Sequence, residues 1–68
     1  QARSELAELL IARGEYEGAM EQLLEIARRD RTYGEDIGRR RLLDVFEMAA
    51  DTPDLVAEYR SRLSAVIF

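Results

Sequence analysis

The fold follows from residues 6–24, which read LAELLIARGEYEGAMEQLL. On both sides of Gly14 the apolar residues recur at three- and four-residue steps, the spacing that keeps them on one face of a helix. Gly14 itself separates the two runs and is suited to the left-handed conformation that ends many helices. Glu15 and Glu17 open the second run, where acids favour the helix dipole. The stretch therefore predicts two helices joined by a tight turn.

The same spacing extends over the rest of the chain and predicts four helices. We expect them at about residues 2–13, 17–29, 35–50 and 53–67. The fourth has the clearest start, because Thr52 can cap it, Pro53 fits its first position and Asp54 favours its dipole. Gly38 weakens the first turn of the third by up to about 1 kcal/mol relative to alanine, which favours a start nearer Arg39. Since no segment shows strand alternation, the predicted fold class is all-α, with two stacked antiparallel helical hairpins.

One apolar stripe of each helix is expected to face the core. In the first helix the stripe is Ala2, Leu6, Leu9 and Leu10. In the second it is Tyr16, Ala19, Leu23, Ile26 and Ala27. In the third it is Leu42, Val45, Phe46 and Ala49, and in the fourth Leu55, Val56, Tyr59, Leu63 and Val66.

The amino-acid composition excludes most kinds of catalytic and metal-binding site. The 68 residues make one small domain, and a hydrophobic content of 47% argues against disorder. The chain has no Cys, His, Trp or Lys, so it lacks a thiol, an imidazole base, a thiolate zinc site and a Schiff-base lysine. No apolar run approaches the roughly 18 residues of a membrane span. We therefore expect no catalytic residue, cofactor, metal or membrane, and we predict that the chain is not an enzyme.

The two halves share an apolar frame. A shift of the chain by 36 residues pairs Leu6 with Leu42, Leu9 with Val45, Leu10 with Phe46, Ala19 with Leu55, Leu23 with Tyr59, and Ala27 with Leu63. Leu24 against Arg60 and Ile26 against Arg62 do not match. The second half is a diverged copy at best, and chance agreement between two amphipathic hairpins accounts for part of the similarity. A repeat near this length made of two antiparallel helices is the tetratricopeptide pattern.

The first half resembles one tetratricopeptide repeat, and the second a degenerate one. The motif's leucine, inter-helix glycine, following aromatic, small residue and large apolar residue fall on Leu6, Gly14, Tyr16, Ala19 and Leu23. The departures are Arg3 for an aromatic, Ala7 for a second glycine and Arg31 for the closing proline.

Three strings resemble a narrower family. LLEIARRDR at 23–31, RRLLDVF at 40–46 and YRSRL at 59–63 are similar to the C-terminal tetratricopeptide-like domain of bacterial thioredoxin-like co-chaperones of the YbbN type, the chaperedoxins. The resemblance implies a cytoplasmic chain in which a thioredoxin-like domain, the seat of any redox chemistry, precedes these residues. It also implies partners: unfolded clients and the chaperonin, docked through the C-terminal end. The alternative is an appendage that oligomerises or positions a thioredoxin-fold redox enzyme.

The chain ends in the apolar run AVIF at 65–68. Leu63 and Val66 are expected to face the core, but the helical period cannot turn Ile67 and Phe68 inward as well. The tail is then a docking or self-association edge, or else Phe68 folds back to cap the stack. The predicted protein-binding residues are Arg60 and Arg62, which would orient an acidic partner, and Val66, Ile67 and Phe68, which would be apolar anchors. A further alternative is a homodimer that buries the helix face left uncovered by the two hairpins.

Basic residues cluster in the middle of the chain. Arg39, Arg40 and Arg41, with Arg28, Arg29 and Arg31, form a possible anion patch. The competing interpretation is structural, because cations are favoured at a helix C-terminus. In addition, the acid-first pairs Glu35–Arg39 and Asp36–Arg40, four residues apart, would stabilise a helix. We expect no nucleic acid to bind, since the chain carries a net charge of −4 that repels phosphate. The row Glu17, Glu21 and Glu25 is expected to be a solvated face, with Glu25 paired to Arg29, and not a metal site.

Overall fold

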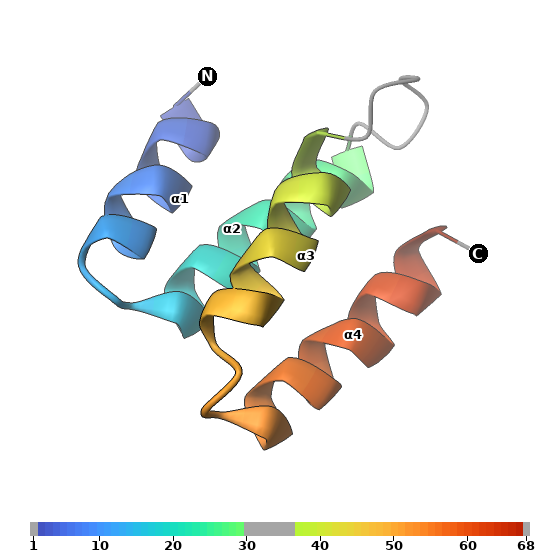
Figure 1. The fold of residues 1–68 in the computed structure, drawn as a ribbon. Coiled ribbons are helices and arrows are strands. Elements are labelled where there is room, and N and C mark those ends of the chain that lie inside the picture. Colours follow the sequence, from blue (N-terminus) through green and yellow to red (C-terminus); the bar gives the residue numbers. More distant parts are fainter. Residues whose placement is uncertain (1, 30–36, 68) are drawn as a thin grey trace.

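The computed structural model describes residues 2–29 and 37–67 as four helices. They are α1 (Ala2–Ala12), α2 (Tyr16–Arg29), α3 (Ile37–Met48) and α4 (Pro53–Ile67) (Figure 1). No strand occurs in these two stretches, so the predicted all-α class with two helical hairpins is confirmed. The bounds predicted for α4 are confirmed at both ends. The start predicted for the third helix at Glu35 lies outside the described residues, and the helix is described from Ile37.

A glycine turn joins α1 to α2, as predicted. Gly14 has a φ of 76°, in the left-handed region that L-residues with a Cβ avoid. Its amide donates to the carbonyl of Ile11 over 3.0 Å, and the amide of Glu15 donates to that of Leu10 over 2.9 Å. These two bonds form a Schellman motif, which satisfies carbonyls that the end of α1 would leave unpaired.

Helix α2 is the centre of the packing, because α1, α3 and α4 all pack against it. Its predicted core residues Ala19, Leu23, Ile26 and Ala27 are buried, while Tyr16 is only half-buried. All four core residues predicted for the third helix are buried, and so are Tyr59, Leu63 and Val66 of α4. Two further buried residues of α2, Met20 and Leu24, were not predicted.

The stripe predicted for α1 is wrong in part. Leu6 is 42% exposed and Leu9 is 52% exposed, whereas Ala7 is fully buried. The reason is position: α1 lies at one edge of the stack and packs on α2, so its opposite side has no covering helix (Figure 1). Several apolar positions of α1 fit the helical period, and the small residue Ala7 is the one that faces α2.

Two local details near α3 differ from the sequence expectations. Gly38 does more than weaken a turn, because a Cβ built on it would lie 2.8 Å from the backbone nitrogen of Ala27 and 3.0 Å from the backbone oxygen of Leu23. The glycine therefore lets α3 approach the backbone of α2 closely. Thr52, expected to cap α4 with its side chain, instead donates its hydroxyl to the Ala49 carbonyl over 2.9 Å, at the end of α3.

Candidate protein-interaction surface

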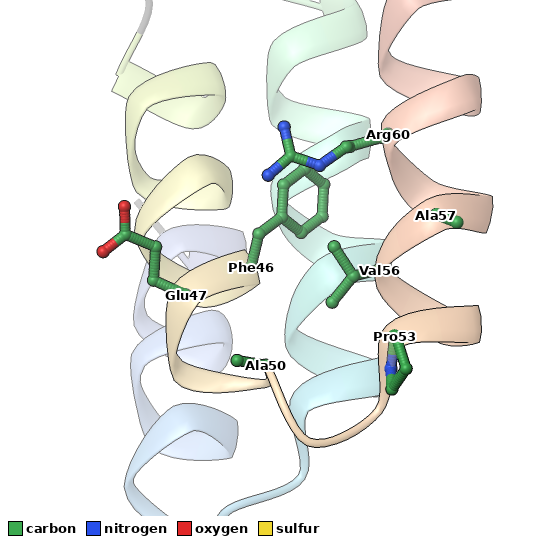
Figure 2. A pocket seen from close by; sticks show the side chains of 7 residues that line it. All are labelled: Phe46, Glu47, Ala50, Pro53, Val56, Ala57 and Arg60. Carbon is green, nitrogen blue, oxygen red and sulfur yellow. The ribbon is translucent and has the colours of Figure 1, made fainter.

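A groove opens between α3 and α4 (Figure 2). It has a volume of about 360 Å³. Its walls are largely apolar, with one acid and one cation among them. The lining residues are Phe46, Glu47, Ala50, Pro53, Val56, Ala57 and Arg60. A concave, mostly apolar surface with a few polar groups at its rim is the usual form of a binding site.

Arg60 covers one end of this groove. Its guanidinium carbon lies 5.1 Å from the centroid of the Phe46 ring, close enough for a cation–π contact (Figure 2). The residue is exposed, and no acid pairs with it within residues 2–29 and 37–67. Arg60 therefore offers an uncompensated positive charge directly beside apolar surface, as the prediction of an acidic partner requires.

Arg62, the second predicted cation of α4, has a different environment. Its guanidinium lies 3.1 Å from Glu21, also pairs with Glu58, and sits 4.8 Å above the ring of Tyr59. Tyr59 in turn donates its hydroxyl to Glu21 over 2.6 Å. Burial, and then the carboxylate of Glu21, raise the pKa of Tyr59 to about 12. Arg62 is thus part of a polar network that ties α4 to α2.

The tail is only partly described. Val66 is 8% exposed and belongs to the core cluster, as expected from its helical phase, so its side chain is not displayed as an anchor. The side chain of Ile67 and all of Phe68 lie outside the described residues. Leu63, the other residue expected to face inward, is buried.

The arginines of the predicted anion patch are engaged to different degrees. Arg41 forms two 2.8 Å contacts with the carboxylate of Glu8 and lies 3.5 Å from Asp44. The hydrogen bond from Arg41 holds the pKa of Glu8 below its ordinary value, and the carboxylate raises the pKa of Arg41. Arg39 is half-buried and Arg40 exposed, and neither makes an ion pair with a residue that the structure describes. Arg31 lies outside the described residues.

Two of the three acids of α2, Glu21 and Glu25, are paired with arginines. Glu25 accepts from Arg28 over 3.2 Å and from Arg29 over 3.3 Å, so the predicted pair of Glu25 with Arg29 is confirmed. The predicted pairs of Arg39 and Arg40 with acids at 35 and 36 fall outside the described residues. Within the described part of the chain, no cluster of three or more metal-ligating side chains occurs.

A family model for the tetratricopeptide repeat matches residues 1–68, the full length of the chain. The chain belongs to the tetratricopeptide repeat family. Tetratricopeptide repeats are a non-catalytic fold that generally mediates contacts between proteins. No curated protein and no solved structure gives a match. None of the four described helices is long and apolar enough to cross a membrane.

Arg60 of this tetratricopeptide chain was predicted from the sequence as a protein-binding residue, whereas the groove beside it was not predicted. Phe46, Val56 and Ala57 looked like core or unremarkable helix positions, and the opening between α3 and α4 has no sequence pattern of its own. One signal was present: Arg60 stands where the first hairpin has Leu24, which is 3% exposed. A cation in place of a core leucine marks a surface that the second hairpin leaves open.

Proposed function

We propose that this tetratricopeptide unit is the protein-interaction domain of a thioredoxin-like co-chaperone, with a thioredoxin-like domain preceding it in the full protein. It binds the chaperonin or unfolded clients through α4 and the chain's end, by apolar contact with acid-to-arginine pairing. The observation that carries the proposal is Arg60, an unpaired cation beside an apolar groove on α4. The three strings similar to chaperedoxins, from α2, α3 and α4, support the choice of partner.

The contributions of the predicted binding residues differ. Arg60 has no acidic partner in the described stretches, so it keeps its charge for another protein. Arg62 already pairs with Glu21 and Glu58, and its loss disturbs the α2–α4 contact. Val66 supports the helix end from inside the core, while Ile67 and Phe68 provide the apolar part of the proposed contact.

The test is binding of purified bacterial chaperonin and of a chemically unfolded client to the 68-residue chain. We expect Arg60→Glu to weaken binding about tenfold or more, since like charge then faces an acidic partner. Removal of residues 67 and 68 alone, which spares the buried Val66, tests the tail. Arg40→Glu is the matched control, because it makes the same charge change on an exposed arginine of α3. Equal binding by all four proteins would reject the proposed site, and absence of binding by the unchanged chain would reject the co-chaperone assignment.

A further inference from the structure

Two apolar surfaces lie at opposite ends of the helix stack. On α1, Leu6 and Leu9 expose 42% and 52% of their surface. On the other side, the groove between α3 and α4 is open to solvent (Figure 2). Figure 1 shows α1 and α4 at the two edges of the molecule. End helices of repeat stacks normally carry a polar outer face, so an apolar one calls for a covering surface.

The exposed face of α1 has an exact counterpart in sequence on α3. Leu6 and Leu9 stand 36 residues before Leu42 and Val45, which are both 0% exposed. Leu42 and Val45 lie on the helix that packs against α2. The uncovered face of α1 therefore corresponds to the face through which α3 packs onto the first hairpin.

The groove also has a counterpart. Its residues Val56 and Arg60 stand 36 residues after Met20 and Leu24, which are 0% and 3% exposed. Met20 and Leu24 lie on α2, against which both helices of the second hairpin pack. The groove is thus the surface that, in the first hairpin, the second hairpin covers.

We propose that a second copy of this chain places its α1 in the α3–α4 groove, in the way that α3 packs on the first hairpin. Leu6 and Leu9 of the incoming copy then take the places of Leu42 and Val45. The site is an interaction surface for this chain itself. Its test by self-association does not depend on the co-chaperone proposal, but Arg60 lines the same groove, so a second copy and the proposed chaperone partner would compete for it.

Charge favours this arrangement at one end. α3 runs antiparallel to α2, since Gly38 at its start lies against the second half of α2. An incoming α1 therefore runs antiparallel to α4, which brings its exposed Arg13 beside the first turn of α4. Asp51 and Asp54 are exposed there, and none of these three residues makes an ion pair within the described ranges. An attractive contact between the copies results.

Charge opposes it at one other position. In the chain, Arg41 of α3 pairs with Glu8 of α1. The same frame places Glu5 of the incoming copy where Arg41 stands and Asp44 where Glu8 stands, so two acids meet. This repulsion weakens the contact between the copies. A variant that replaces Glu5 by arginine should therefore strengthen the contact.

The contact joins unlike surfaces, so each copy keeps one free groove and one free α1. Such heterologous association grows into open chains unless it closes into a ring. A single helix in a short groove buries less than a standard interface, and we expect a dissociation constant on the order of 100 μM.

The test is sedimentation velocity of the chain at rising concentration, with two variants that each block one surface. Leu9→Glu removes the α1 face, and Ala57→Glu fills the groove; both sites are exposed, and circular dichroism verifies the fold. We expect the unchanged chain to form dimers and larger species, and each variant alone to stay at the 7.8 kDa monomer. An equimolar mixture of the two should form dimers only, since one good face and one good groove remain.

Three results would overturn the proposal. They are a monomeric unchanged chain at millimolar concentration, undiminished association of either single variant, and a mixture that stays monomeric. Glu5→Arg adds a gain-of-function test, because it places a cation opposite Asp44. We expect association about threefold to tenfold tighter, against little change for Glu17→Arg, which alters net charge equally on α2. Equal tightening by both would show a net-charge effect and contradict the proposed contact.

Discussion

Tyr59 of α4 donates its hydroxyl to Glu21 of α2 across 2.6 Å. Tyr59 is 2% exposed, and its hydroxyl meets the carboxylate of Glu21 that also pairs with Arg62. One residue therefore supplies both apolar burial and a directional bond at the contact between α2 and α4. This combination is expected of a tyrosine at the rim of a core.

Removal of that hydroxyl should loosen α4. We expect Tyr59→Phe to lower the free energy of unfolding by about 1 kcal/mol, the usual net worth of one hydrogen bond. Chemical denaturation followed by circular dichroism measures the change. Tyr16→Phe is the control, since Tyr16 is half-buried and makes no described side-chain hydrogen bond, and it should leave stability unchanged. Equal losses in the two variants would show a general cost of removing a tyrosine hydroxyl and would contradict a specific bond from Tyr59 to Glu21.

The same bond predicts an alkaline transition. The pKa of Tyr59 is raised from 10.0 to about 12, so the folded state favours the neutral phenol. This contribution to stability is complete below pH 10 and disappears as the pH rises toward about 12, because the unfolded chain loses the proton more easily. Tyrosinate absorbance should show one late-titrating tyrosine, absent from Tyr59→Phe. A late component that persists in this variant would belong to another tyrosine.

The pair of Glu8 and Arg41 predicts a dependence on acid. The carboxylate of Glu8 has a lowered pKa in the folded chain. The contribution of the pair to stability is therefore present above the pKa of the unfolded state and is lost as the pH falls. Since Glu8 is half-exposed, we expect Glu8→Gln to cost about 0.2–1 kcal/mol at neutral pH and less in high salt. Glu5→Gln is the matched control on α1. A double-mutant cycle with Arg41→Gln that gives no coupling energy would contradict the contact.

Substitution of Gly38 by alanine should change stability in the direction opposite to that expected from helix propensity. Alanine is favoured over glycine in a helix by up to about 1 kcal/mol, yet its Cβ at this position would press on the backbone of α2. We expect Gly38→Ala to destabilise the chain, with an overpacking cost of about 1–3 kcal/mol that exceeds the gain. Gly18→Ala is the control, because its Cβ would meet only the side chain of Leu10, at 3.2 Å. Thermal unfolding separates the two, and a higher melting temperature for Gly38→Ala would contradict the close approach.

The small residue that α1 buries should resist enlargement. Ala7 is 0% exposed on the side of α1 that packs on α2. We expect Ala7→Leu to cost about 1–3 kcal/mol through overpacking, while Ala12→Leu, at an exposed site of the same helix, should be nearly neutral. Equilibrium denaturation of both proteins measures the difference. A neutral Ala7→Leu would show spare room between the two helices.

Prediction from the sequence was most accurate for features that depend on neighbouring residues in the chain. The start of α4 was predicted because Pro53 restricts the backbone there and Asp54 favours the helix dipole. The turn at Gly14 was predicted because a left-handed residue favours glycine. The core of α3 was predicted because that helix has a neighbour on the side its apolar stripe faces.

Features that depend on distant neighbours could not be predicted. Leu6 and Leu9 have the spacing of core residues, but they face outward because α1 is an edge helix. The importance of Gly38 depends on how closely α2 passes, and the groove depends on the separation of α3 from α4. Both are properties of packing geometry that no single segment encodes.

The central position of α2 determines how the molecule opens. Because α1, α3 and α4 each pack on this helix, its amide protons should exchange with solvent only when the whole chain unfolds. Helix α4 has a groove on its α3 side and rests on α2, so it can detach alone in a partial opening and its amides should exchange sooner. A partner that fills the groove would slow exchange along α4 first, which gives hydrogen exchange a direct signature of occupancy.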